Sequence, residues 1–200
     1  MTTSVFGQIL TGYDVEQAAQ TTIELWLATY LRELERQNDI DADLLRPIAS
    51  TIQVNDFAQY QGEPLPLMVV VCPGMESTPS RHEDGFYEAW WTVGVAVIVE
   101  AVDETAARRL AQIYAAAIRA LLVQHPALGG FAGGIALGIE SHEDAPADFL
   151  RAGCAVARVV FSVLTEGVVT ASLGPASPDD DPEPWPQVDT VHIDAERLTT

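Results

Sequence analysis

The sequence has 200 residues, 48% of them hydrophobic, and a formal net charge of −19 at pH 7. A chain of this size and composition can bury one core of ordinary size, so a single folded unit is expected. Its positive charge comes from arginine alone, and the chain contains no lysine. Groove-type nucleic-acid binding, which depends on clustered basic residues, is therefore not expected. The sequence has no apolar run long enough for a membrane span and no recognisable secretory signal, so we expect folding in a cytoplasm.

The first helix is predicted from Asp14 to Asn38, where apolar residues recur at three- and four-residue steps. Asp14 and Gln17 have the spacing of a capping box at its start. The apolar stripe consists of Val15, Ala19, Ile23, Trp26, Leu27, Tyr30, Leu31 and Leu34. This pattern indicates an amphipathic helix that packs on another element.

Two short strands are predicted next, over Ser50–Val54 and Leu65–Cys72, because both segments are rich in β-branched residues. Pro73-Gly74 is expected to end the second strand. A long polar loop, Gly74–Gly85, then leads to the next strand. Loops of this kind often contact neighbouring proteins.

The clearest strand is predicted from Phe86 to Ala101, where the hydrophobic pattern has a period of two. Trp91 belongs to the side that forms the core. Trp90 points to the opposite side, where it either packs under a helix or is exposed at a protein interface.

Asp103 is predicted to cap a second helix that runs to about Gln124. Two further strands are expected over Ile135–Glu140 and Cys154–Thr165. The glycine-rich run Gly129–Gly134 between the helix and these strands is interpreted as a connection and not a phosphate-binding loop, because it follows a helix.

The predicted fold class is α+β, with a mixed or mainly antiparallel sheet of about four or five strands and two long helices packed on one face. Residues 1–169 are expected to form this domain. Residues 170–200 are rich in Pro, Asp, Ser and Glu, so they cannot bury enough apolar surface to fold alone. They are predicted to form an extended acidic arm.

No catalytic motif, cofactor-binding motif or metal site is predicted. The chain lacks a Gly-x-Ser-x-Gly elbow, a P-loop and a His-Glu-x-x-His motif. His-Glu-Asp occurs at residues 82–84 and again at residues 142–144. Consecutive loop residues rarely converge on one ion, so both are interpreted as solvated loop charge. The residues predicted to contact other proteins are Arg81, His82, Phe86, Trp90, Arg108 and Trp185.

The order of the predicted elements also resembles a known family. The segments that carry the likeness are Leu25–Leu31, Leu67–Cys72 followed by Pro73-Gly74, Tyr87–Val95, Ala106–Arg119 and Arg158–Phe161. Together they resemble the tail-terminator, or tail-completion, proteins of long-tailed, siphovirus-type bacteriophages, especially those of actinobacteria. The likeness covers about residues 14–168, and the acidic arm departs from the compact family pattern.

The resemblance implies a structural virion protein of the tail and neck, assembled in the host cytoplasm. Its copies would form a homohexameric ring on the last ring of tail-tube protein, stop tube growth and join the head-tail connector. Six copies would carry a formal charge of about −114, six times that of one chain. A negative lumen would let DNA pass without sequence-specific binding.

Three other functions remain open on the sequence. The resemblance to tail terminators does not exclude another neck component, such as a head-tail stopper or adaptor. A small acidic binding or inhibitor domain, such as a DNA mimic, is compatible with the net charge. An enzyme with a site spread over loops would have His142, Glu143 and Arg151 as its first candidates.

Overall fold

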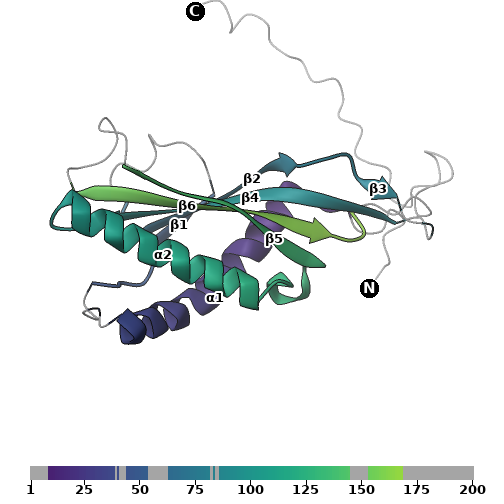
Figure 1. Ribbon diagram of the computed structural model, residues 1–200. Coiled ribbons are helices and arrows are strands. Elements are labelled where there is room, and N and C mark those ends of the chain that lie inside the picture. Colours follow the sequence, from purple (N-terminus) through teal and green to yellow (C-terminus); the bar gives the residue numbers. More distant parts are fainter. Residues whose placement is uncertain are drawn as a thin grey trace, which may run out of the picture.

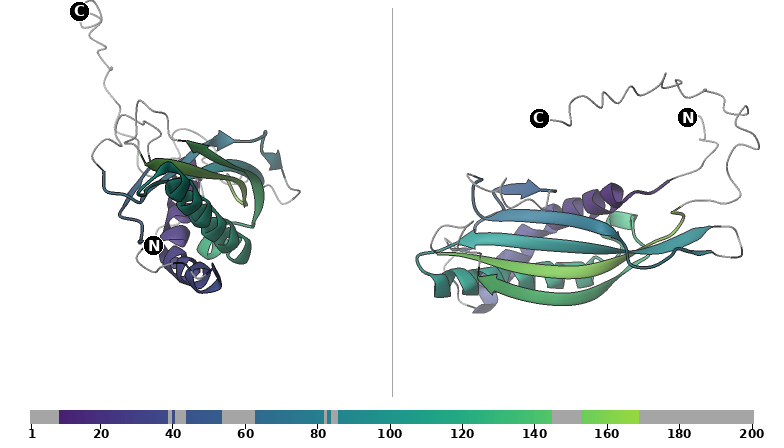
Figure 2. Two further views of the ribbon diagram at one scale, coloured as in Figure 1. Left: turned by 60° about the vertical axis from the view of Figure 1, so that its left-hand side comes forward. Right: turned by 90° about the horizontal axis from the view of Figure 1, so that it is seen from above.

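A computed structural model describes residues 9–38, 40, 44–53, 63–81, 83, 86–144 and 153–168, with no side chain described at 142–144. Two long helices lie against one face of a twisted sheet (Figures 1 and 2). Among the described residues, the sheet has six strands, including one of two residues, and it contains both parallel and antiparallel pairs. The predicted α+β class, with both helices on one face of a mixed sheet, is confirmed.

Helix α1 spans Gly12–Asn38 and begins two residues earlier than predicted. Its capping box is formed by Thr11 and Asp14: the Thr11 N–H donates to Asp14 Oδ2 at 2.7 Å, and the Asp14 N–H donates to Thr11 Oγ1 at 3.4 Å. The predicted pairing of Asp14 with Gln17 is therefore wrong by one turn. Thr-x-x-Asp satisfies the capping spacing as well as Asp-x-x-Gln does, and the hydroxyl of Thr11 is the N-cap acceptor.

The strands are ordered β1-β2-β4-β6-β5 across the sheet, and β3 pairs with β4 off this path. Strand β1 runs parallel to β2, and the other pairs are antiparallel. The strands span Ser50–Ile52 (β1), Leu67–Met75 (β2), Ser80–Arg81 (β3), Tyr87–Glu100 (β4), Gly134–Asp144 (β5) and Cys154–Thr165 (β6). β1 and β5 therefore form two different edges of the sheet.

Strand β2 does not end at Pro73-Gly74 as predicted but continues to Met75. A register shift between Val71 and Gly74 marks a bulge, after which Gly74 faces Thr92 of β4. β1 pairs with β2 only as far as Val69. Proline is tolerated here because it lies at a bulge, beyond the residues that pair with β1.

Strand β5 is longer than predicted and includes residues 142–144, which were interpreted as a loop. Their polar sequence is compatible with a strand because β5 is an edge, where charged residues are common. A register shift between Leu137 and Glu140 interrupts its pairing with β6.

Helix α2 spans Glu104–Gln124 and begins as predicted, with the Asp103 carboxylate accepting the Ala106 N–H at 2.8 Å. A 3-10 turn, η2, follows at Leu128–Gly130. Alternate residues of β4 and β6 pack under the two helices and form the main core, with Tyr114 and Phe161 as its largest fully buried side chains. A smaller cluster on the opposite face consists of Leu67, Val69, Ile98 and Val156.

Candidate functional site

Four of the six residues predicted to contact partners are described. Arg81 is exposed in β3, Phe86 is 43% exposed at the start of β4, and Trp90 is half-buried in β4. Arg108 is exposed in the first turns of α2, the helix that follows the far end of β4, so the fold does not bring it together with the other three. His82 and Trp185 lie outside the described residues.

The two adjacent tryptophans occupy opposite faces of the sheet. Trp91 is buried under the helices, and its indole N–H donates to Thr165 Oγ1 at 2.7 Å. Trp90 pairs with Leu164 of β6 and projects from the face that the helices do not cover. Of its two predicted positions, packing under a helix is therefore excluded.

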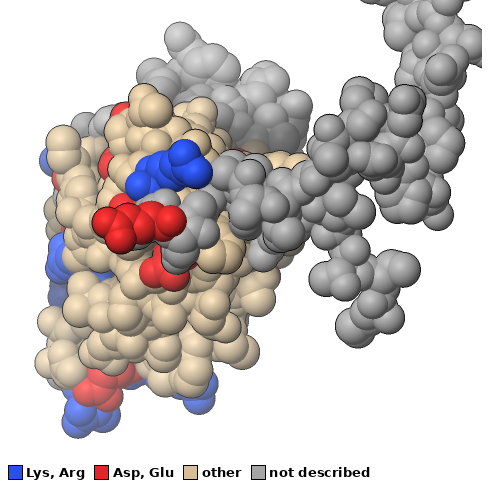
Figure 3. Space-filling view, turned by 90° about the vertical axis from the view of Figure 1, so that its right-hand side faces the viewer, with Lys and Arg blue, Asp and Glu red and all other residues tan. Residues whose placement is uncertain are grey.

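Large apolar side chains gather at the end of the molecule where α1 and β4 begin. We call Ile9, Tyr13, Met75 and Phe86 the apolar end; their exposed fractions are 62%, 60%, 40% and 43%. Backbone hydrogen bonds hold this end together: Leu10 N donates to Val168 O at 3.2 Å, and Val168 N donates to Tyr87 O at 2.9 Å. Figure 3 looks onto this end of the molecule, and most of its described surface is uncharged.

The edge strand β5 also exposes apolar side chains. Leu137, just before the bulge, is 41% exposed, and Ile139, within the bulge, is 79% exposed. The outer edge of β5 has no partner strand among the described elements. Such an edge offers unpaired backbone groups to a neighbouring chain, although a bulge limits how regularly another strand can pair with it.

An open groove lies between α1 and the turn that follows α2. Its volume is about 670 Å³, and its apolar wall contains Leu25, Trp26, His125, Leu128 and Phe131. The Trp26 and His125 rings stack with centroids 4.5 Å apart. We call this feature the aromatic groove. Trp26 was predicted to lie in the buried stripe of the helix, but it is 38% exposed and forms part of the groove instead.

A neighbouring aromatic side chain fixes this stack in place. Tyr30 meets the His125 ring edge-on, with centroids 6.1 Å apart. The Tyr30 hydroxyl donates to Gln124 Oε1 at 2.8 Å and thereby ties α1 to the end of α2. The groove could not be predicted from hydrophobic periodicity, because its wall combines residues about 100 positions apart in the sequence.

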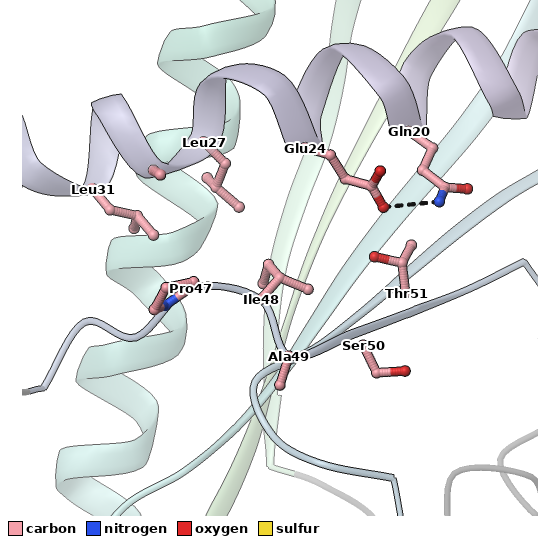
Figure 4. A pocket seen from close by; sticks show the side chains of 10 residues that line it. Gln20, Glu24, Leu27, Leu31, Pro47, Ile48, Ala49, Ser50 and Thr51 are labelled. Carbon is pink, nitrogen blue, oxygen red and sulfur yellow. Dashed lines mark hydrogen bonds between the residues drawn. The ribbon is translucent and has the colours of Figure 1, made fainter.

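A second pocket, of about 440 Å³, lies between α1 and the segment that leads into β1 (Figure 4). Leu27, Leu31, Pro47 and Ile48 form its apolar part. At its polar end, Gln20 Nε2 donates to Glu24 Oε1 at 2.8 Å. The lining contains one carboxylate and no histidine or cysteine, so it supplies no acid–base or nucleophilic pair for chemistry.

The shifted pKa values are explained by local hydrogen bonds and by burial. The Arg36 guanidinium lowers the pKa of Glu33 to about 2, and hydrogen bonds to Thr11 lower the pKa of Asp14. Burial raises the pKa of the Cys72 thiol and raises that of Tyr114 to about 12. Among the described residues, no group of three or more His, Cys, Asp or Glu side chains could hold a metal ion.

Most of the loop residues considered for metal binding or catalysis lie outside the described residues. At 82–84 only Glu83 is described, and it is exposed. Residues 142–144 are described by their backbone alone, and Arg151 is not described. Among the described residues, the candidate sites are the apolar end, the edge strand β5 and the aromatic groove, whose exposed apolar side chains are suited to binding protein.

The comparisons with known proteins give no family. No protein-family model and no curated protein matches the chain. Among solved structures, it is similar to a chain from the virion of a native gene transfer agent particle, with a TM-score of 0.38 and 18% identity, covering 66% of this chain and 90% of that chain. A likeness at this level carries no argument about function. No described helix is long and apolar enough to cross a membrane.

Proposed function

We propose that this chain is a non-enzymatic structural subunit of a phage-type virion, a tail terminator. Six copies would form a ring on the end of the tail tube, end its polymerisation and meet the head-tail connector on the other side. DNA would pass through the lumen. The domain would comprise residues 1–169, with residues 170–200 as an arm, and assembly would take place in the host cytoplasm.

The apolar end is the observation that carries this proposal. A chain with a formal charge of −19 has ample charge with which to cover its surface, yet Ile9, Tyr13, Met75 and Phe86 remain exposed together. An apolar patch that a soluble chain leaves exposed indicates a protein interface. Its side chains would be buried when neighbouring subunits or the tail tube cover this end.

The arrangement of the sheet edges adds support. β1 and β5 are different edges, and neither has a further partner strand among the described elements. Contacts between two different surfaces of the same chain build rings or filaments, whereas contacts between identical surfaces build two-fold dimers. The number six rests on the order of elements that resembles the tail terminators.

The solution mass of the protein, alone and mixed with tail-tube subunits, tests the proposal. Light scattering should give six times the 21.6 kDa mass of one chain, and negative-stain images should show rings that cap tubes. Phe86→Glu should weaken assembly more than about 100-fold, because an unpaired charge buried in an interface costs about 3–5 kcal/mol.

Val102→Glu is the matched control. Val102 is 99% exposed and lies just after the opposite end of β4 from Phe86, so a charge there should leave the ring intact. A persistent monomer that neither binds nor caps tubes would refute the proposal. Rings that bind a portal-side protein but not tube subunits would indicate a head-tail stopper instead of a tail terminator.

A further inference from the structure

The aromatic groove is open and has a defined direction. It follows α1 from Asp14 to Trp26, about 18 Å along the helix axis at 1.5 Å per residue. One wall is α1, and the other contains His125, Leu128 and Phe131. Leu25 is 69% exposed and Trp26 is 38% exposed, so large apolar side chains face solvent at the end of the groove where these two residues lie.

The chain itself contains a segment of matching chemistry. Pro182-Glu183-Pro184-Trp185-Pro186 places three prolines on alternate positions around a tryptophan. Proline-rich segments favour the polyproline II conformation and bind in grooves lined by aromatic side chains. We propose that Pro182–Pro186 docks in the aromatic groove of its own chain, with proline rings packed on the Trp26–His125 stack.

Length and position agree with this assignment. Five residues of polyproline II span about 16 Å, close to the length of the groove. Val168 lies beside the start of α1, because its carbonyl accepts the Leu10 N–H. The fourteen residues from there to Pro182 can cover at most about 43 Å in the same conformation, so the segment reaches the groove without a second copy.

Hydrogen bonding and charge are compatible with docking of Pro182–Pro186 in the aromatic groove. A polyproline II backbone makes no internal hydrogen bonds, so its carbonyls are free to accept from a groove. Among the described residues, none accepts a hydrogen bond from the Trp26 indole N–H. Asp14, the one carboxylate lining the groove, is bound to the Thr11 N–H and hydroxyl. The acidic run Asp179–Asp181 would pass the N-terminus of α1, the positive end of the helix dipole.

Fluorine NMR of the full chain labelled with 5-fluorotryptophan tests the docking. The four tryptophans give four signals, which single Trp→Phe variants assign. Trp185→Ala should move the Trp26 signal and leave the Trp91 signal in place, because Trp91 is buried in the core. The double variant Pro184→Ala/Pro186→Ala should do the same, and Pro175→Ala, earlier in the arm, should move neither signal.

Thermolysin cleavage before Val188, followed by mass spectrometry, provides an independent measurement, because the protease must also bind the residues that precede this bond, Pro184–Gln187. With the segment docked nine-tenths of the time, Trp26→Ala should raise the cleavage rate about tenfold, since cleavage follows the undocked population. Val102→Ala, at an exposed position away from the groove, should leave the rate unchanged. The rate should also be independent of protein concentration.

Two results would overturn the proposal. One is a Trp26 signal whose chemical shift is unchanged in both Trp185→Ala and the double proline variant. The other is protection of the Gln187–Val188 bond that disappears on dilution, which would place the segment in the groove of another copy. Neither result depends on whether the chain forms a ring, so this proposal can fail while the tail-terminator proposal stands.

Discussion

Tyr114 is the buried side chain whose protonation bears most directly on stability. Its hydroxyl donates to the backbone carbonyl of Arg46, and burial raises its pKa to about 12. An unfolded tyrosine loses its proton near pH 10. The stabilising contribution of the protonated hydroxyl is therefore complete below pH 10 and is lost as the pH rises through 12. Between pH 8 and pH 11.5 we expect a loss of about 2 kcal/mol.

Tyr114→Phe should separate this titration from other alkaline effects. The variant loses one hydrogen bond, so at pH 8 it should be about 1 kcal/mol less stable than the natural chain. Between pH 8 and pH 11.5, however, it should lose about 2 kcal/mol less. Urea unfolding at the two pH values measures both quantities. Tyr13→Phe, at a side chain 60% exposed, is the control and should follow the natural chain; equal alkaline losses in all three proteins would contradict the assignment.

Strand β5 depends on one glycine at its bulge. A Cβ atom at Gly138 would lie 2.9 Å from the Val160 carbonyl oxygen of β6, and a backbone atom cannot easily move away. Gly138→Ala should therefore destabilise the protein by about 1–3 kcal/mol and speed amide exchange along β5. Gly134→Ala is the matched control in the same strand, because nothing lies within 4 Å of its Cβ position. Equal stability of the two variants would show that β5 shifts freely at the bulge.

The main elements were predictable because their hydrophobic periods are long and regular. Both helices and the paired core strands β4 and β6 follow from the three-to-four-residue and two-residue patterns. The errors lie where a local signal competes with tertiary pairing. Pro73 usually ends a strand, yet β2 continues through it by means of a bulge, and the polar residues 142–144 form part of an edge strand.

The candidate surfaces were less predictable than the fold. Phe86 and Trp90 could be selected from the sequence because large aromatic residues are enriched at interfaces. Trp26 was assigned to the core, since its spacing along α1 fits the buried stripe and only the packing of His125 shows that it lines a groove. A surface formed by segments distant in sequence depends on how the helices are positioned relative to one another. The hydrophobic periodicity of one helix gives no information about that position.

Charge should govern how the whole molecule assembles. Chains with a formal charge of −19 repel one another, and this repulsion extends about 30 Å at 0.01 M salt but only about 8 Å at 0.15 M. The apolar end carries few charged side chains (Figure 3), so little ionic attraction is lost when salt is added. The association constant of the proposed ring should therefore rise, on the order of tenfold, between these salt concentrations.

Sedimentation velocity over this salt range measures the effect, with circular dichroism to verify that the subunits remain folded. Phe86→Glu, which should not assemble, serves as the control and should remain monomeric at every salt concentration. Hydrophobic contact and ionic pairing make opposite predictions, because screening weakens attraction between opposite charges as well as repulsion between like charges. A ring that dissociates as salt is added would thus show that ion pairs hold the subunits together, and the apolar end would lose its assigned role.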